Sequence, residues 1–134
     1  MPRRHLHRTI TKKIFSIDSW QLYTIDEDKT MKVSVIIPIY KVEAFIERCA
    51  ATLMEQTLPE VEYIFVDDAT SDNSIDVLEE VIARYPQRKG QVRIVHNAEN
   101  KGLPAARNTG LALATGEYIF HCDSDDYVEP SMLE

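Results

Sequence analysis

The stretch that decides the fold reads YIFHCDSDD, residues 118–126. Its first five residues are of strand type, which suits a buried, pleated segment. Asp123, Asp125 and Asp126 follow at once, and carboxylates do not enter such an interior without compensation of their charge. We therefore expect the chain to leave a sheet at about Asp123, at the carboxyl end of a strand, where open α/β sheets bind ligands.

The three carboxylates of this stretch have two interpretations. Carboxylates held close together raise one another's pKa unless a cation is present, and a hard divalent ion such as Mg²⁺ or Mn²⁺ is the usual partner. The alternative is a solvated acidic turn, which is the commoner meaning of an isolated D-x-D-D because short motifs match by chance. The rest of the chain decides between them.

Length and composition indicate a soluble globular chain of at most one ordinary domain, with 134 residues, 44% apolar and 28% charged. The formal charge of −7 argues against non-specific binding of nucleic acid. Two cysteines, Cys49 and Cys122, favour a reduced chain without a disulfide framework. Since no apolar run could span a bilayer and no signal peptide is recognisable, we expect a cytoplasmic chain, at most peripherally associated with the inner face of the membrane.

Residues 1–30 differ from the rest of the chain. Their apolar side chains follow no sustained period, and a polar break at residues 26–30 precedes Met31. We expect residues 31–134 to form the folded domain and residues 1–30 to form a loosely attached N-terminal extension. Because the first 13 residues carry five Lys or Arg and no acid, a basic arm that touches a membrane surface is the alternative.

Strand and helix patterns alternate from Met31 onward. Nearly continuous apolar runs predict four strands, at residues 33–37, 61–66, 92–95 and 118–122. Apolar residues three or four positions apart predict three helices, at residues 44–54, 75–85 and 103–116. This order predicts an α/β fold with a mostly parallel sheet, helices on both faces and right-handed crossovers. Pro38 is expected to end the first strand, residues 87–91 to form a polar loop, and residues 128–131 to begin a further helix.

Polar residues follow three of these strands. Pro38 and Tyr40 come after the first, Asp67 and Asp68 after the second, and residues 123–126 after the last. In a parallel sheet these ends share one edge, where five Asp residues are costly without a ligand. A nucleotide with its metal ion would explain both sets of acids, because an acid at a strand end can accept hydrogen bonds from a base or a ribose. The alternative for Asp67 and Asp68 is N-capping of the next helix.

The segment NKGLPAARN, residues 100–108, leads into the third predicted helix. Gly102 can turn the backbone just ahead of the helix, whose N-terminus attracts anions. The chain has neither a Walker loop nor a G-x-G-x-x-G fingerprint. Arg107 either reaches the acidic edge, at Asp68, Asp123 or a phosphate, or is an ordinary surface arginine.

Five motifs in this order resemble glycosyltransferase family 2. They are VSVIIPIY at residues 33–40, VDDATSD at 66–72, N-x-G-x-x-x-A-R-N-x-G at 100–110, A-x-G-E-Y-I at 114–119 and DSDD at 123–126. Each motif alone is weak, but their joint occurrence over residues 32–134 is specific. The resemblance implies an inverting transferase with the nucleotide-binding half of the GT-A fold, a Rossmann-like sheet that is here truncated after the D-x-D strand.

The resemblance also implies a donor site. Pro38 and Tyr40 would line the nucleotide pocket, and Asp68, with Asp67 beside it, would hold the uracil of a UDP-sugar. Arg107 would belong to the same nucleotide-sugar site.

Asp123-Ser124-Asp125 would be the family's D-x-D motif. Asp125 would be the most direct ligand of Mg²⁺ or Mn²⁺, Asp123 would lie near the metal or the ribose, and Ser124 would lie in the nucleotide-sugar site. The reaction would be displacement at the anomeric carbon by an acceptor hydroxyl, with the metal-bound diphosphate as the leaving group. The acceptor would be a carbohydrate or a lipid-linked molecule, as in polysaccharide or cell-envelope biosynthesis.

The chain departs from the family in two respects. Ala69 and Thr70 stand where members commonly have Gly and Ser, so a turn that needs positive φ at residue 69 would be strained. The chain also ends just past the D-x-D, and the resemblance places the acceptor-binding half and the catalytic base beyond it, so no base is assigned. The alternatives are a nucleotide-binding remnant without turnover, and a metal-dependent nucleotidyltransferase, which would need a glycine-rich loop after the first strand.

Overall fold

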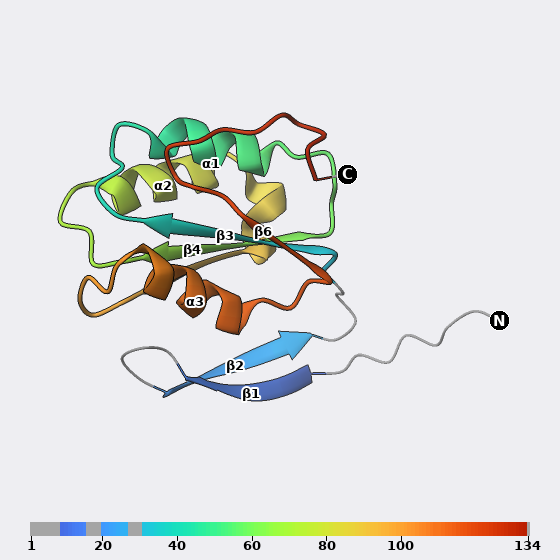
Figure 1. Cartoon of the computed structure of the whole chain (residues 1–134). Coiled ribbons are helices and arrows are strands. Elements are labelled where there is room, and N and C mark those ends of the chain that lie inside the picture. The colour runs from blue at the N-terminus through green and yellow to red at the C-terminus, as the bar shows by residue number, and fades with distance from the viewer. Residues whose placement is uncertain (1–8, 16–19, 27–30, 134) are drawn as a thin grey trace.

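The computed structural model describes residues 9–15, 20–26 and 31–133, and its main feature is a four-stranded parallel sheet (Figure 1). The strand order is β5-β4-β3-β6. The strands are β3 (Val33–Ile39), β4 (Val61–Asp67), β5 (Val92–His96) and β6 (Tyr118–His121). Every residue of β3 and β4 is buried, as expected of strands covered on both faces. The predicted α/β fold is confirmed.

Helices cover both faces of this sheet (Figure 1). They are α1 (Ile46–Met54), α2 (Ser74–Ala83) and α3 (Leu103–Leu113). The helices α1 and α2 share a core with Val35, Ile37 and other residues of one face, whereas α3 packs with Ile64 and Val66 on the opposite face. Because successive strand residues point to opposite faces, the continuous apolar runs supply both cores at once.

Pro38 does not end the first strand, contrary to the prediction, since β3 continues to Ile39. The carbonyl of Ile36 faces β6, where it accepts a hydrogen bond from Cys122, and the carbonyl of Ile39 faces β4. Pro38 therefore has its nitrogen on the β6 side, beyond the last β6 partner of β3 at Ile36. A proline is tolerated there because its missing N–H lies past the last residue pair of β3 and β6, where that ladder has ended.

Helix α3 ends at Leu113, before the predicted end at Gly116, because a partly buried hydrogen-bond network draws the chain back to the sheet. Glu62 Oε2 accepts hydrogen bonds from the Ser34 hydroxyl and from the N–H and hydroxyl of Thr115. Ser34 Oγ in turn accepts a hydrogen bond from the Gly116 N–H, and a Cβ at Gly116 would lie only 2.7 Å from Ser34 N. These contacts fix where β6 begins beside β3.

The predicted polar loop at residues 87–91 belongs to a 3₁₀ helix, η1 (Pro86–Gln91), which is held by a buried arginine. Arg88 is 6% exposed. Its guanidinium donates hydrogen bonds to four backbone carbonyls of the segment after α1, those of Met54, Gln56, Leu58 and Pro59. One side chain thus bonds the last carbonyl group of α1, that of Met54, and three carbonyl groups of the segment that follows the helix.

The helix expected to begin at residues 128–131 is also absent from the described chain, where residues 130–133 form a turn. Backbone groups of this segment bond to α1 and the residues after it instead. The Val128 N–H donates to Thr52 Oγ1, and the Glu129 carbonyl accepts from Gln56 Nε2. The segment that follows the acidic cluster is therefore tied to α1.

A separate antiparallel hairpin of β1 (Thr9–Phe15) and β2 (Trp20–Asp26) lies beside α3 (Figure 1). The sequence did not indicate these strands, because their apolar residues do not alternate regularly. Residues 1–8, 16–19 and 27–30 lie outside the described residues, so the loosely attached extension stays a prediction. None of the helices in the described part of the chain has the length and apolar character that a membrane span requires.

Replacing Arg88 by Ala should destabilise the chain by roughly 3 kcal/mol, because several buried carbonyl groups lose a charged donor. Urea denaturation of the purified chain measures the change. Arg84→Ala is the matched control, because Arg84 is exposed and forms a long surface ion pair with Glu47, at 3.9 Å. Such a pair contributes little to stability. A loss below about 1 kcal/mol for Arg88→Ala would contradict the structural role assigned to this side chain.

Candidate functional site

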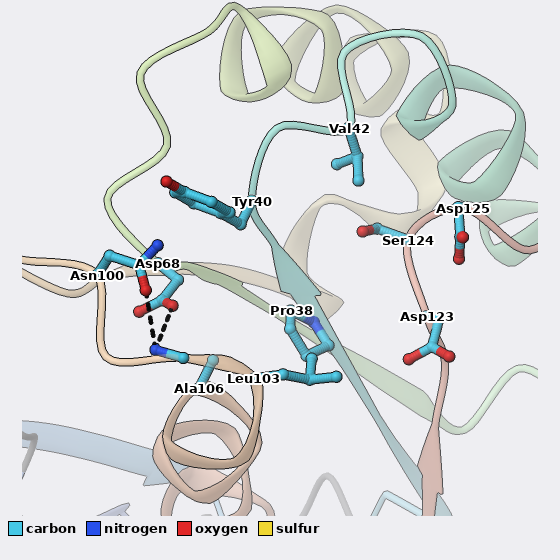
Figure 2. A pocket seen from close by; sticks show the side chains of 11 residues that line it. Pro38, Tyr40, Val42, Asp68, Asn100, Leu103, Ala106, Asp123, Ser124 and Asp125 are labelled. Carbon is cyan, nitrogen blue, oxygen red and sulfur yellow. Dashed lines mark hydrogen bonds between the residues drawn. The ribbon is translucent and has the colours of Figure 1, made fainter.

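The carboxyl ends of β3, β4 and β6 meet the N-terminus of α3 around a cavity of about 440 Å³ (Figure 2). Eleven residues line it: Pro38, Tyr40, Val42, Asp68, Asn100, Gly102, Leu103, Ala106, Asp123, Ser124 and Asp125. Figure 2 shows Asp68 on one side, Asp123 and Asp125 on the other, and Pro38 between them. The convergence of separate strand ends on one edge, predicted from the sequence, is observed.

Asp68 is buried, at 3% exposed, and its carboxylate is held by the loop before α3. Oδ1 accepts hydrogen bonds from Asn97 Nδ2 at 3.0 Å and from the Lys101 N–H at 2.9 Å, and Oδ2 accepts one from the Gly102 N–H at 2.9 Å. The anion at this helix N-terminus is thus a side chain of the same protein. Because a carboxylate oxygen can accept two hydrogen bonds, Oδ2 retains acceptor capacity toward the cavity that Asp68 lines.

Asp67 and Arg107, both predicted as site residues, are not among the residues that line the cavity. The Asp67 carboxylate accepts a hydrogen bond from the Thr70 N–H at 2.9 Å and lies 2.8 Å from His96 Nδ1 at the end of β5. Arg107 Nη2 donates to Asp123 Oδ1 at 3.0 Å, one of the alternatives expected for this arginine. Arg107 therefore contacts the cavity wall through Asp123, whereas Asp67 holds the loop after β4 and the end of β5.

The loop after β4 carries the backbone strain anticipated from the sequence. Ala69 has a φ of 59° and Lys41, in the facing loop after β3, has a φ of 52°. The Lys41 N–H donates to Thr70 Oγ1 at 2.8 Å, so the two left-handed turns brace each other. Tyr40, which lines the cavity, comes directly before this braced turn.

Asp72 fastens the same two loops together. Its carboxylate accepts hydrogen bonds from the hydroxyls of Thr70 and Ser74, from the Ser74 N–H and from the Glu43 N–H. Desolvation raises the pKa of Asp72, but the hydrogen bonds from Ser74, Thr70 and Glu43 outweigh it and lower the pKa to about 2. The ionised form is therefore the one that holds the loops.

The D-x-D segment forms a tight turn. The Asp126 N–H donates to the Asp123 carbonyl at 3.0 Å, which places Ser124 and Asp125 at the centre of the turn. Ser124 is 6% exposed, whereas Asp123, Asp125 and Asp126 are exposed. One carboxylate oxygen of each acid lies within 4.8 Å of the others.

Two buried thiols pack beneath this turn. Cys49 and Cys122 are unpaired, with their sulfur atoms 4.0 Å apart, and both sulfurs lie near the Asp123 carbonyl oxygen, at 3.7 and 3.6 Å. The hydrogen bond to Cys122 and burial raise the pKa of the Cys49 thiol, which favours its neutral form.

Within the described chain, three of the five carboxylates at this edge have a hydrogen-bond or ion-pair partner, and two do not. Asp67, Asp68 and Asp123 each have a donor within the protein. Among the described residues, the Asp125 and Asp126 carboxylates have no hydrogen-bond or ion-pair partner. Three convergent carboxylate oxygens are the hard donors that Mg²⁺ and Mn²⁺ prefer, so the residues fit such an ion.

Sequence reasoning missed part of the cavity wall. Val42, Leu103 and Ala106 line the cavity, but their apolar side chains carry no chemical signature that separates a pocket wall from a core. Asn100 and Gly102 belong to the predicted entry of the third helix and to one of the five family motifs, but they were not predicted as site residues. The available signal was a glycine two residues before Pro104, at the start of the helix. The turn at this glycine directs the N–H groups of Lys101 and Gly102 toward Asp68.

The fold and the site define an open α/β domain with a cavity at the carboxyl edge of a parallel sheet. The model of the family "Glycosyl transferase family 2" matches residues 34–134. The chain belongs to this family, so the resemblance noted from its motifs is confirmed.

Relatives and solved structures agree with this assignment. The uncharacterised glycosyltransferase EpsJ of Bacillus subtilis (strain 168) is 45% identical over 102 residues, which cover 76% of this chain and 28% of EpsJ. A crystal structure of S. aureus TarS 1–349 in complex with UDP matches with a TM-score of 0.69 at 32% identity, covering 77% of this chain and 30% of that chain. The mannosyltransferase PcManGT from Pyrobaculum calidifontis, in complex with GDP-Man and Mn²⁺, matches with a TM-score of 0.67 at 29% identity, covering 73% of this chain and 28% of that chain. The chain thus spans less than a third of each of these proteins.

Ala69→Gly should stabilise the chain by about 1 kcal/mol, because it removes the cost of holding a Cβ in the left-handed region. Ala112→Gly, at an exposed position in α3, should instead destabilise it by about 0.5–1 kcal/mol. Thermal or urea unfolding measures both. Equal effects of the two substitutions would contradict the strain assigned to residue 69.

Asp72→Asn should destabilise the chain at neutral pH, and the difference from the parent should shrink in acid. The folded-state pKa of Asp72 is about 2, against an ordinary value of 3.8, so its contribution is fully present above pH 3.8 and is lost as the pH falls toward 2. Urea denaturation at a series of pH values measures the difference. A difference that stays constant down to the acid limit would refute the assignment.

Proposed function

We propose that this chain is the donor-binding part of a metal-dependent, inverting glycosyltransferase that uses a UDP-sugar. One observation carries the proposal. Asp68 and the D-x-D acids line the same cavity, and of the five acids at this edge Asp125 and Asp126 have no partner among the described residues. A cation shared with a nucleotide diphosphate would balance the charge at this edge.

The cavity wall suggests how a nucleotide would lie. Tyr40 offers an aromatic face and Pro38 an apolar floor to a base, while the free acceptor capacity of Asp68 Oδ2 suits a base N–H, as in uracil. The UDP in the TarS complex supports this choice of nucleotide. The GDP-Man of the PcManGT complex shows that a related protein binds a guanine nucleotide. The preference of this chain between uracil and guanine nucleotides is therefore to be measured.

The other side of the cavity would hold the diphosphate. Asp125 would ligate Mg²⁺ or Mn²⁺ together with Asp123 and Asp126, and Arg107 would keep the Asp123 carboxylate oriented. When bound, the ion supplies Lewis-acid assistance to departure of the diphosphate. The Mn²⁺ of the PcManGT complex supports a divalent metal without deciding between the two ions.

The reaction that this site would serve is displacement at the anomeric carbon by an acceptor hydroxyl, with inversion. The acceptor would be a carbohydrate or a lipid-linked molecule, and the enzyme would work in the cytoplasm or at the inner face of the membrane. We assign no catalytic base to residues 31–133. The β3–α1 loop, residues 40–45, contains no glycine, which disfavours the nucleotidyltransferase alternative.

Isothermal titration calorimetry of the purified chain with UDP, with and without Mn²⁺, tests the proposal. UDP should bind in the presence of Mn²⁺, and Asp125→Ala should weaken that binding roughly tenfold or more, because a direct ligand is lost. Glu79→Gln, an exposed acid of α2, removes the same charge away from the site and is the control.

Metal-independent binding of UDP, or equal binding to the Asp125→Ala chain, would contradict the proposal. Preference for CTP or ATP would favour a nucleotidyltransferase. A donor-hydrolysis assay then separates an active enzyme from a binding remnant.

A further inference from the structure

The acidic turn is held at both ends, and the first contact beyond its far end is one stacked pair of side chains. On the near side, β6 delivers Asp123 next to the buried thiols. On the far side, the guanidinium of Arg48 on α1 lies 3.4 Å from the ring centroid of Tyr127, the residue directly after the cluster. Tyr127 is 56% exposed, so this ring is not fixed by burial in the core.

We propose that Arg48 and Tyr127 are positioning residues, which hold Asp123, Asp125 and Asp126 in the converged arrangement that a divalent cation requires. The proposal rests on the function proposed above and adds residues that touch neither metal nor nucleotide in it. The Asp123–Asp126 turn is closed by a single backbone hydrogen bond, so its geometry depends on how the flanking segments are anchored.

The neighbouring contacts extend the same anchor. After Tyr127, the Val128 N–H bonds to Thr52 Oγ1, and the Glu129 and Pro130 carbonyls accept hydrogen bonds from Gln56 Nε2 and from the Thr57 N–H. Residues 127–130 thus lie along α1 and the residues after it. The contact between Arg48 and Tyr127 is the one in this series that lies nearest to Asp126. In this proposal it is the contact that restrains the acidic turn itself.

An anchor of this kind acts through populations. When three like charges repel, the chain samples arrangements in which the carboxylates are apart, and the apparent affinity for a cation falls with the fraction of chains that are competent to bind. An exposed cation–π contact shifts such an equilibrium about two- to fivefold. Removing it should weaken Mn²⁺ binding by about that factor.

The charge of Arg48 provides a way to exclude a simpler explanation. If Arg48 acted only as a positive charge near the acids, Arg48→Ala would strengthen binding of a cation. If it acts as an anchor, the same substitution weakens binding. Tyr127→Ala removes the ring without changing the charge, and Tyr127→Phe keeps a ring on which the guanidinium can stack.

The experiment measures Mn²⁺ affinity of the full chain by electron paramagnetic resonance of the free ion, in the parent and in four variants. Arg48→Ala and Tyr127→Ala should each raise the dissociation constant about two- to fivefold. Tyr127→Phe should stay near the parent, and so should Arg84→Ala, which removes an exposed arginine outside the site. Unchanged affinity in Tyr127→Ala, or tighter binding in Arg48→Ala, would overturn the proposal.

A second readout needs no metal. Hydrogen exchange of the Asp126 amide, which closes the turn, should be about two- to fivefold faster in Tyr127→Ala than in Tyr127→Phe. Equal exchange rates would overturn the anchoring role even if Mn²⁺ binds as proposed. Faster exchange in Tyr127→Ala, in a chain that binds no Mn²⁺, would instead show that the anchor exists and that the metal-dependent function fails.

Discussion

Parallel pairing of β3 with both β4 and β6 is the constraint from which the rest of the structure follows. The pairing sets Ile39 opposite Asp67 and ends β6 at His121, opposite Ile36, so the chain leaves three strands at one edge of the sheet. Burial of β3 and β4 on both faces stabilises this arrangement, and its consequence is that acids far apart in sequence share a small volume. The chemistry of the edge is a result of the same topology that forms the core.

Three of the five acids at this edge have their negative charge stabilised by partners within the protein. Asp67 has His96, Asp68 has backbone N–H groups, and Asp123 has Arg107, so each is stabilised by a donor from another element. Asp125 and Asp126 have no such partner among the described residues. The carboxylates that have no partner in the described part of the chain lie directly beside carboxylates that do. This edge is therefore a site suited to an external cation.

Periodicity and polarity made much of this predictable. Continuous apolar runs indicated buried parallel strands, and acids placed directly after them indicated the edge at which Asp68 and Asp125 line one cavity. The features that could not be predicted depend on distant partners. Pro38 could be placed inside β3 only once β6 was known to end opposite Ile36. The different roles of Asp67 and Asp68 could be assigned only once His96, at the end of β5, was known to contact Asp67. The same holds for Arg88, whose spacing is that of a surface residue but whose partners are carbonyl groups some thirty positions earlier.

Chemical-shift mapping by NMR tests most directly whether the two acidic sets form one site. Addition of UDP with Mg²⁺ should shift the amide signals of Gly102, beside Asp68, and of Ser124 and Asp126 along a single binding curve, with no comparable change for UDP alone. Shifts confined to one side of the cavity, or produced equally by UDP without the metal, would contradict the account.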